Sequence, residues 1–438
     1  MKELDLNIDK LNDKIETTSL SRNFGYITRV VGLIIESQGP EVSVGELCRI
    51  ESQERNIRAE VVGFADKKVL LMPIGDMEGI NPGARVVATG EKLKVKVGDS
   101  LLGEVLNGIG EPLTAEKGEL NNLHEVPVFS DPPEPLLRQR ITDPLSLGIK
   151  SIDGLLTCGR GQRVGIFSGS GVGKSTLLGM AARNTEADIN VIGLVGERGR
   201  EVRDFIERDL GPEGLKRSIV VVATSDKPAL VRVKAAHITT AIAEYFRDQG
   251  QDVLMMMDSI TRVATALREV GLAAGEPPAT RGYPPSVFAE LPKLLERTGT
   301  NQHGSITALY TVLVEGDDFN EPVSDTVRGI LDGHILLSRA LASKGHYPAV
   351  DVLDSVSRVM PEIVDEEHLK AAEELKRLIS AYRESEDLIN IGAYEPGSNP
   401  EVDQALEKID QINDFLTQGI NESSNFSSTI STLKDISN

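Results

Sequence analysis

Aromatic residues are scarce in this sequence of 438 residues: tryptophan is absent, and Phe, Tyr and Trp together account for 4%. Between Gly25 and Leu93 only Tyr26 and Phe64 are aromatic. Proteins that bind single-stranded nucleic acid stack its bases on aromatic side chains within a basic groove. The formal net charge of −20 also repels a phosphate backbone. We therefore expect no nucleic-acid partner.

Cysteine and histidine are equally sparse. Cys48 and Cys158 are the only cysteines, and they lack the paired spacing of zinc sites and redox motifs. We expect both to be buried thiols. The six histidines are scattered without metal-ligand spacing, so no zinc site is expected.

The sequence contains neither a recognisable signal peptide nor a membrane-spanning run. The start, Met1–Leu6, lacks a basic region followed by a continuous apolar one, and no uninterrupted apolar stretch reaches the length of a membrane span. We therefore expect a cytoplasmic protein. Because 438 residues exceed what one hydrophobic core usually serves, we expect two or three domains.

Short β-type runs with turn signals beside them fill the chain from Gly25 to about Leu93. The runs are Tyr26–Ile35, Ile57–Phe64, Val69–Pro73 and Arg85–Ala88. They predict a small β-barrel or sandwich over residues 24–93.

From Lys94 to Pro361 apolar strands alternate with amphipathic stretches, which indicates a parallel sheet covered by helices in an α/β domain over residues 94–361. The predicted strands are Arg163–Phe167, Ile189–Val195, Ser218–Thr224, Val253–Met257, Ile306–Val314 and His334–Leu337.

The two ends of the chain carry helical patterns. Apolar residues recur at helical spacing from Leu369 to Tyr382, which predicts a helical domain over residues 362–438, although Ser423–Asn438 is rich in Ser, Thr and Asn and is expected to be frayed. An amphipathic helix over Lys2–Thr17 is predicted within residues 1–20. That helix either docks a partner, or packs on its own barrel or frays. Its apolar face is formed by Leu4, Ile8, Leu11 and Ile15.

A phosphate-loop motif follows the predicted strand Arg163–Phe167 and opens a predicted helix, Thr176–Arg183. Its residues are Gly169, Ser170, Gly171, Val172, Gly173, Lys174, Ser175 and Thr176. Glycines let backbone N–H groups close around phosphates, toward which the helix N-terminus presents its positive dipole end.

Two residues of this loop are suited to Mg-ATP. Lys174 would reach the β- and γ-phosphates of ATP, and the Ser175 hydroxyl would ligate Mg²⁺. The usual motif has glycine at the position of Ser168, so the first turn must form here without that freedom. Neighbouring glycines make this tolerable, and we expect ATP and Mg²⁺ as ligands.

Two carboxylates follow predicted strands. Asp258 ends the apolar run Val253–Met257, where phosphate-loop proteins hold their metal, although a helix cap is the alternative. Glu197 follows the strand Ile189–Val195, where it can polarise the attacking water, although a surface salt bridge with Arg198 is the alternative.

With these residues in place, the chain resembles the ATPases of the flagellar and type III protein-export apparatus, relatives of the catalytic subunit of F-type ATP synthases. The resemblance covers Gly25 to about Gly397 and rests on the stretches Ile152–Arg163, Gly196–Arg203 and Leu272–Pro278. It implies an α/β fold with a small N-terminal β-barrel, a central RecA-like P-loop ATPase domain with a parallel sheet, and a C-terminal helical domain.

The resemblance also implies roles for single residues. Glu197 becomes the catalytic carboxylate, and Arg198 and Arg262 line the phosphate site. Tyr347 stacks near the adenine. Arg358, which would otherwise be read as a solvated residue in a serine-rich turn, becomes the arginine finger of a neighbouring subunit's site.

Further implications concern assembly. The family forms homohexamers, and a stator or regulator subunit docks on its N-terminal helix. Export chaperones with their cargo and the export gate are further partners, at the base of the apparatus on the inner face of the membrane. Thr298, where many injectisome relatives have proline, favours the flagellar branch over the injectisome branch.

Two other functions are compatible with the same core. A hexameric RNA translocase would need the basic, aromatic surface that residues 25–93 lack. A non-catalytic or synthase subunit of a mixed rotary ring would share the fold. The presence of Lys174, Glu197 and Asp258 argues against a non-catalytic role.

Overall fold

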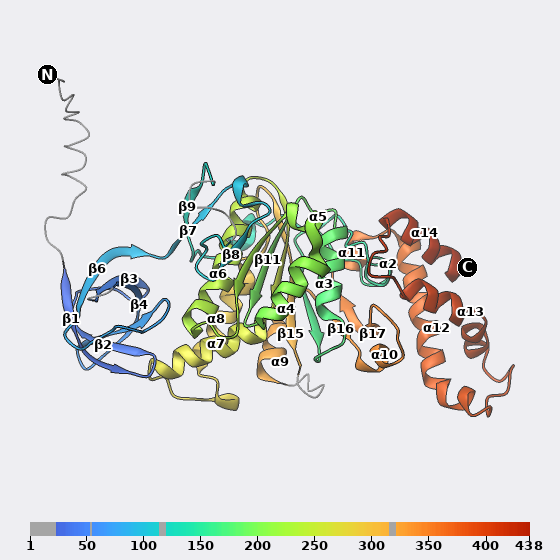
Figure 1. Cartoon of the computed structure of the whole chain (residues 1–438). Coiled ribbons are helices and arrows are strands. Elements are labelled where there is room, and N and C mark those ends of the chain that lie inside the picture. The colour runs from blue at the N-terminus through green and yellow to red at the C-terminus, as the bar shows by residue number, and fades with distance from the viewer. Residues whose placement is uncertain (1–22, 53–54, 114–119, 315–320) are drawn as a thin grey trace, which may run out of the picture. The chain divides into compact units, whose positions relative to one another are not determined.

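The computed structural model describes residues 23–52, 55–113, 120–314 and 321–438 (Figure 1). They form two compact units, one of the chain up to Leu93 with Ala273–Gly275, and one of Lys94–Leu272 with Glu276–Asn438. The predicted N-terminal helix, residues 1–20, lies outside the described residues. The boundary between residues 361 and 362 stays a prediction, because both sides of it belong to the second unit.

The first unit is a closed antiparallel barrel with the strand order β1-β2-β5-β4-β3-β6. Alternate side chains point inward, and Ile35, Ile50, Val61 and Leu71 are fully buried in its core. The barrel predicted from the sequence is confirmed. Its strands are β1 (Phe24–Val31), β2 (Ile34–Gln38), β3 (Glu46–Glu51), β4 (Asn56–Ala65), β5 (Lys68–Pro73) and β6 (Arg85–Lys92).

Two details of the barrel differ from the prediction. The single run Tyr26–Ile35 is divided into β1 and β2 at Gly32, whose φ of 55° makes the turn. Strand β3 was missed. Charged residues at Glu46, Arg49 and Glu51 interrupt its short apolar pattern, although Cys48 lies buried in the core as expected.

The second unit is built on one sheet with the strand order β17-β16-β10-β15-β13-β11-β12-β8. The sheet is parallel except at β17, which runs antiparallel to β16, and at β14, which pairs antiparallel with β15. The strands are β8 (Val105–Asn107), β10 (Arg163–Ser168), β11 (Ile189–Val195), β12 (Ser218–Ala223), β13 (Asp252–Asp258), β14 (Gly299–Thr300), β15 (Ser305–Leu313), β16 (Gly333–Leu337) and β17 (Val350–Ser357). The six strands predicted for this sheet are therefore found within one residue at either end. A separate pair is formed by β7 (Lys94–Val97) and β9 (His124–Pro127).

Helices cover both faces of this sheet. Leu194 of β11 packs in one core with Leu178 of α3 (Lys174–Asn184). The adjacent Gly193 faces Thr239 of α6 (Ala229–Asp248) on the other side, where a Cβ would lie 2.7 Å from the threonine hydroxyl. Because successive strand residues point to opposite faces, α3 and α6 sandwich the sheet. The fold predicted from the sequence is confirmed.

The remaining helices connect and flank these elements (Figure 1). They are α2 (Lys150–Leu155), α4 (Gly199–Asp204), the π-helical turn η3 (Phe205–Leu210), α5 (Gly211–Lys216), α7 (Ile260–Ala273), α8 (Pro285–Glu296), α9 (Pro322–Ile330), α10 (Arg339–Ser343), α11 (Met360–Ile363), α12 (Glu366–Asn390), α13 (Pro400–Leu416) and α14 (Phe426–Ser437). Short 3-10 turns lie at Asp99–Leu101, Pro135–Leu137 and Thr280–Gly282. Among the described helices none has the length and apolar character that a membrane span requires.

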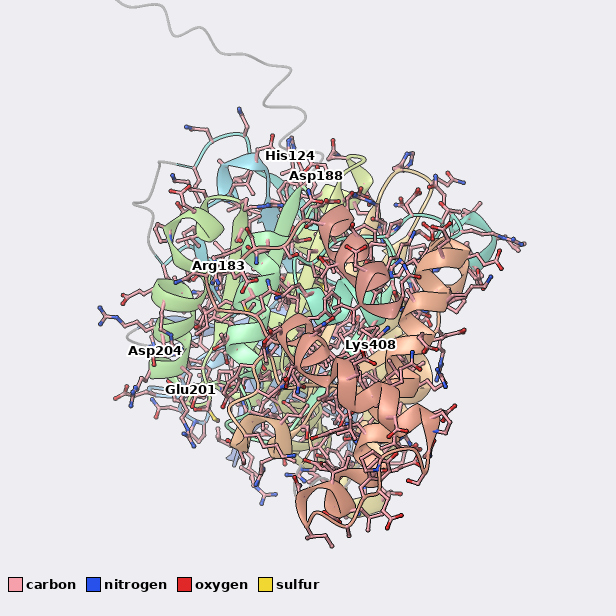
Figure 2. All side chains as sticks on the ribbon, turned by 90° about the vertical axis from the view of Figure 1, so that its right-hand side faces the viewer. His124, Arg183, Asp188, Glu201, Asp204 and Lys408 are labelled. Atoms are coloured by element: carbon pink, nitrogen blue, oxygen red, sulfur yellow. The ribbon has the colours of Figure 1, made fainter. Side chains whose placement is uncertain are left out.

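The prediction of a frayed end over Ser423–Asn438 is wrong. Helix α14 packs on α12 and α2, with Leu433 fully buried in the core. Its two ends are also bonded, because the Asn425 side chain accepts from the Ser427 amide and Lys408 of α13, labelled in Figure 2, donates to the Ile436 carbonyl at 2.8 Å. The serine-rich composition concealed an apolar stripe at helical spacing.

A core substitution tests this packing. Leu433→Ala should lower the free energy of unfolding by about 2–5 kcal/mol, because it leaves a cavity in a buried site. The exposed neighbour Thr432 offers the matched control, and Thr432→Ala should change stability by less than about 1 kcal/mol. Urea unfolding measures both values. Equal effects of the two substitutions would mean that α14 contributes no core packing.

Candidate nucleotide site

The phosphate-loop motif forms the connection between β10 and α3. Strand β10 ends at Ser168 and α3 begins at Lys174, two residues before the predicted helix start. Gly171 and Gly173 have φ values of 80° and 90°, which glycine adopts without strain. The loop therefore has the strand, turn and helix order that phosphate binding requires.

Three charged side chains from different elements meet at this loop. Lys174 at the start of α3 pairs with Asp258 at the end of β13, and its Nζ lies 3.9 Å from Oε1 of Glu197. Strands β11 and β13 are neighbours with Leu194 opposite Asp258, so their carboxyl ends bring the two carboxylates to the same edge of the sheet.

Asp258 has a second partner that the sequence did not suggest. The hydroxyl of Thr311 on β15 donates to Oδ1 of Asp258 at 2.7 Å, and both side chains are buried. The sequence carries no signal for this contact, because β15 also contains Ser305 and Thr307, and only the strand order places Thr311 beside Asp258. These contacts orient the Asp258 carboxylate from the neighbouring strand β15. None of them caps a helix, which was the alternative role for Asp258.

The environment of Glu197 favours its protonated form. Burial, and after it the negative charge of Asp258, raises the pKa of Glu197 to about 7, although Lys174 acts in the opposite direction. Its buried Oε1 has no hydrogen-bond partner among the described residues. An unpartnered carboxylate oxygen beside a lysine and a second carboxylate fits a site that receives a polar ligand.

Arg198 and Arg262, which the resemblance places at the phosphate site, differ in placement. Arg198 is 82% exposed and pairs with Glu201 at 3.4 Å, so the surface salt bridge between Arg198 and Glu197 is not formed. Arg262 on α7 packs against Gly196, directly before Glu197, where a Cβ would lie 2.8 Å from the arginine Cβ. Only glycine leaves room for this approach, which brings the stem of Arg262 beside the loop after β11.

Arg358 lies apart from this cluster. It directly follows β17, which is separated from β10 by β16 in the sheet, and its side chain is exposed. Its guanidinium donates to the Leu331 carbonyl at 3.2 Å. Among the described contacts none joins Arg358 to Lys174, Glu197 or Asp258.

A cavity of about 730 Å³ adjoins the loop on the side away from the carboxylates. Tyr347, 45% exposed, lines it, and its ring lies within 3.5 Å of a Cβ built on Gly173. Another part of its lining comes from the segment after α13, including Thr417 and Gln418, which sequence reasoning missed. No periodic pattern marks that segment in the sequence.

Comparisons with known proteins agree with this architecture. Residues 148–357 match the nucleotide-binding domain of the ATP synthase alpha/beta family, and residues 27–90 match its beta-barrel domain. Residues 364–435 match the T3SS EscN ATPase C-terminal domain. The chain belongs to the ATP synthase alpha/beta family.

Within that family the chain is similar to flagellum-specific ATP synthases and to type 3 secretion system ATPases. The chain is 58% identical to the flagellum-specific ATP synthase of Bacillus subtilis (strain 168), over 98% of this chain and 99% of that protein. It is 50% identical to the type 3 secretion system ATPase of Xanthomonas euvesicatoria, over 97% of both. These relatives confirm the resemblance and the ATPase class predicted from the sequence.

Solved structures show the same fold. The assembled ATPase EscN from the type III secretion system of enteropathogenic E. coli superposes with a TM-score of 0.89 at 48% identity, over 94% of this chain and all of EscN. EscN in complex with its central stalk EscO gives a TM-score of 0.88 at 47% identity, with the same coverage.

Proposed function

We propose that the chain is the Mg-ATP-hydrolysing motor subunit of a flagellar protein-export apparatus. The observation that carries the proposal is the meeting of Lys174, Glu197 and Asp258 at the phosphate loop, with a buried oxygen of Glu197 that has no hydrogen-bond partner among the described residues. These are the charges that hydrolysis of a nucleoside triphosphate requires: a cation for the phosphates, a carboxylate for a metal and a base for water.

Each residue then has a defined task. Lys174 binds the β- and γ-phosphates, while backbone amides of Gly169, Ser170, Gly171, Val172, Gly173 and Thr176 surround them. The Ser175 hydroxyl and the Asp258 carboxylate would hold Mg²⁺, which when bound would supply positive charge to neutralise the phosphates. Glu197 accepts a proton from the attacking water through its unpartnered oxygen.

The remaining predicted residues surround this centre. Tyr347 provides an aromatic face in the cavity of about 730 Å³, which is large enough for a nucleoside. Arg262 can turn from its exposed position toward the phosphates, because its stem already packs on Gly196. Arg198 is exposed on the same loop and is free to exchange Glu201 for a phosphate oxygen.

The elevated pKa of Glu197 sets a pH dependence. A base must be deprotonated to accept a proton, so kcat/KM should rise as pH increases through about 7 and level off above it. The residual activity of Glu197→Gln should lack this rise. ATP titrates in the same range, but that contribution would appear in both proteins. A wild-type profile parallel to that of the variant would exclude Glu197 as the titrating group.

We further propose a homohexamer in which Arg358 of one subunit completes the site of the next. The exposed position of Arg358, away from its own Lys174, supports an action between subunits. The solved structure of EscN as an assembled ATPase supports a ring. The complex of EscN with its stalk EscO supports a regulatory partner for this chain as well.

Other parts of this proposal rest on the family. Residues 1–20 would dock the stator subunit, and export chaperones, their cargo and the export gate would meet the ring at the cytoplasmic face of the membrane. The flagellar branch is preferred because the relative at 58% identity is flagellum-specific, whereas the injectisome relative is 50% identical. The RNA translocase has no support from these relatives, which cover nearly the whole chain.

Deleting the gene tests the assignment to the export apparatus. We expect filament and hook proteins to disappear from the medium while other secretion continues, and Lys174→Ala should fail to restore them. Loss of injected effector proteins with intact flagella would assign the chain to the injectisome branch. Normal export of both classes would refute the proposed function.

A further inference from the structure

One wall of the nucleotide cavity is formed by a segment without regular secondary structure. Helix α13 ends at Leu416 and α14 begins at Phe426, and the residues between them form no helix or strand. From this segment Thr417, Gln418, Gly419, Ile420 and Glu422 line the cavity. The wall must therefore be held in place by contacts other than backbone ladders.

Gln418 supplies these contacts. Its backbone N–H donates to the Tyr347 carbonyl at 2.9 Å. Its side-chain Nε2 donates to the carbonyls of Gly148 and Glu422, each at 2.8 Å, and its Oε1 accepts from the Lys150 amide at 2.9 Å. Gln418 is only 6% exposed. Both donors and the acceptor of the carboxamide are therefore occupied by protein groups.

The partners of Gln418 are themselves fixed. The buried carboxylate of Asp153 on α2 accepts from the amides of Leu147 and Gly148, both at 2.9 Å, and from the Ser146 hydroxyl at 2.8 Å. The turn before α2 thus presents the Gly148 carbonyl in one orientation. Asp153 therefore stabilises the turn before α2. It belongs to the distinctive stretch Ile152–Arg163, which contributes no residue to the cluster of Lys174, Glu197 and Asp258.

Two further contacts hold helix α2 against the C-terminal helices α12 and α13. The Gly154 carbonyl hydrogen-bonds Nε2 of His368 at 2.8 Å, and a Cβ on Gly154 would lie 2.8 Å from the ring of Phe415. Lys150 pairs with Glu422 at 3.2 Å. Gln418 is therefore the point at which a rigid turn, the loop of Tyr347 and the irregular wall are tied together.

We propose that Gln418 is a positioning residue that holds the base-side wall of the nucleotide cavity against the Tyr347 loop, and so sets affinity for the nucleoside part of ATP. The inference rests on the proposed function of the site. Because both Nε2 hydrogens and Oε1 bond protein groups, Gln418 acts through the wall and through Tyr347. It has no role in binding the phosphates, which lie at Lys174.

The decisive substitution is Gln418→Glu, which keeps the shape and the acceptor for the Lys150 amide. It removes the Nε2 donor and places a carboxylate oxygen against two carbonyl oxygens, so the wall should shift. We expect KM for ATP, and the dissociation constant measured by calorimetry, to rise about tenfold. The value of kcat should stay within about twofold of wild type.

Inorganic tripolyphosphate separates this effect from a general loss of structure. It binds the phosphate loop without a base, so its inhibition constant should be unchanged in Gln418→Glu. Gln418→Met is uncharged and of similar length. It should also raise KM for ATP without changing the inhibition constant of tripolyphosphate, and it replaces Gln418→Glu if that variant is unstable. The exposed Gln302, in the turn before β15, offers Gln302→Glu as the matched charge control, with no change in KM.

The outcomes are distinct. An unchanged KM in Gln418→Glu and Gln418→Met would overturn the inference, as would a parallel rise in the inhibition constant for tripolyphosphate. A wild-type protein that binds neither ATP nor tripolyphosphate would instead refute the proposed function of the site.

Discussion

Replacing Arg358 by lysine should leave ATP binding and ring assembly close to wild type while lowering kcat by about 10³–10⁵, the range that arginine fingers contribute in other phosphoryl-transfer systems. The planar guanidinium donates two parallel hydrogen bonds to phosphate oxygens, whereas lysine offers a point charge. Arg358 is exposed, and the described hydrogen bond of its guanidinium goes to the Leu331 carbonyl, so the side chain can be redirected at little cost. Steady-state hydrolysis of rings isolated by size measures the effect.

Mixed rings test whether Arg358 acts between subunits. Neither Arg358→Ala nor Lys174→Ala alone should be active, but rings that contain both should regain activity, because an intact loop can lie beside an intact arginine. Wild-type activity per subunit should also rise steeply with concentration as rings form. Activity that is flat across assembly, or mixed rings without recovery, would exclude a shared site.

Glu197→Gln and Lys174→Ala should fail in different ways. Glu197→Gln retains Lys174 and should bind ATP normally, but without a base its kcat should fall by about 10²–10⁴. Lys174→Ala removes the cation that binds the phosphates and should weaken ATP binding itself. It also leaves the buried Asp258 without its counter-ion, so a loss of stability is expected as well.

Glu207→Gln is the matched control for the first substitution. Glu207 is 61% exposed and pairs with Arg203 at the surface, so its loss should leave kcat unchanged. Isothermal titration with ATP and single-turnover hydrolysis separate binding from chemistry. Near wild-type turnover by Glu197→Gln would show that another group activates the water.

The sheet and the catalytic cluster were accessible from the sequence because both depend on local patterns. Strand β11 is buried along its whole length, so it is apolar apart from Asn190, and a polar residue that follows such a run must lie at its carboxyl end. Glu197 and Asp258 follow from this rule alone. Strand β17 was missed because Asp351, Asp354 and two serines interrupt its apolar pattern.

Contacts between distant segments were not accessible in this way. Gln418 bonds Gly148 and Lys150 across roughly 270 positions of the chain, and the turn in which it lies has no periodicity. The same limit applies to Thr311, because its contact with Asp258 depends on β13 and β15 being neighbours in the sheet. Helix α14 was mispredicted for a different reason. Its serine-rich composition indicates a frayed end, whereas the spacing of its apolar residues indicates a packed helix.

Two parts of the site differ in how their backbone is held: β11, which leads to Glu197, is a buried strand, whereas the wall at Gln418 has no regular secondary structure. The backbone of β11 lies between β12 and β13 and is shielded on both faces, so we expect its amide hydrogens to exchange with solvent only through large-scale unfolding. Glu197, anchored to that strand, shares this rigidity. The wall at Gln418 depends on a few side-chain bonds, so we expect it to open at a smaller free energy than the strand. Under the proposed function, the charges of Lys174, Glu197 and Asp258 would then stay preorganised while the nucleoside enters and leaves past this wall.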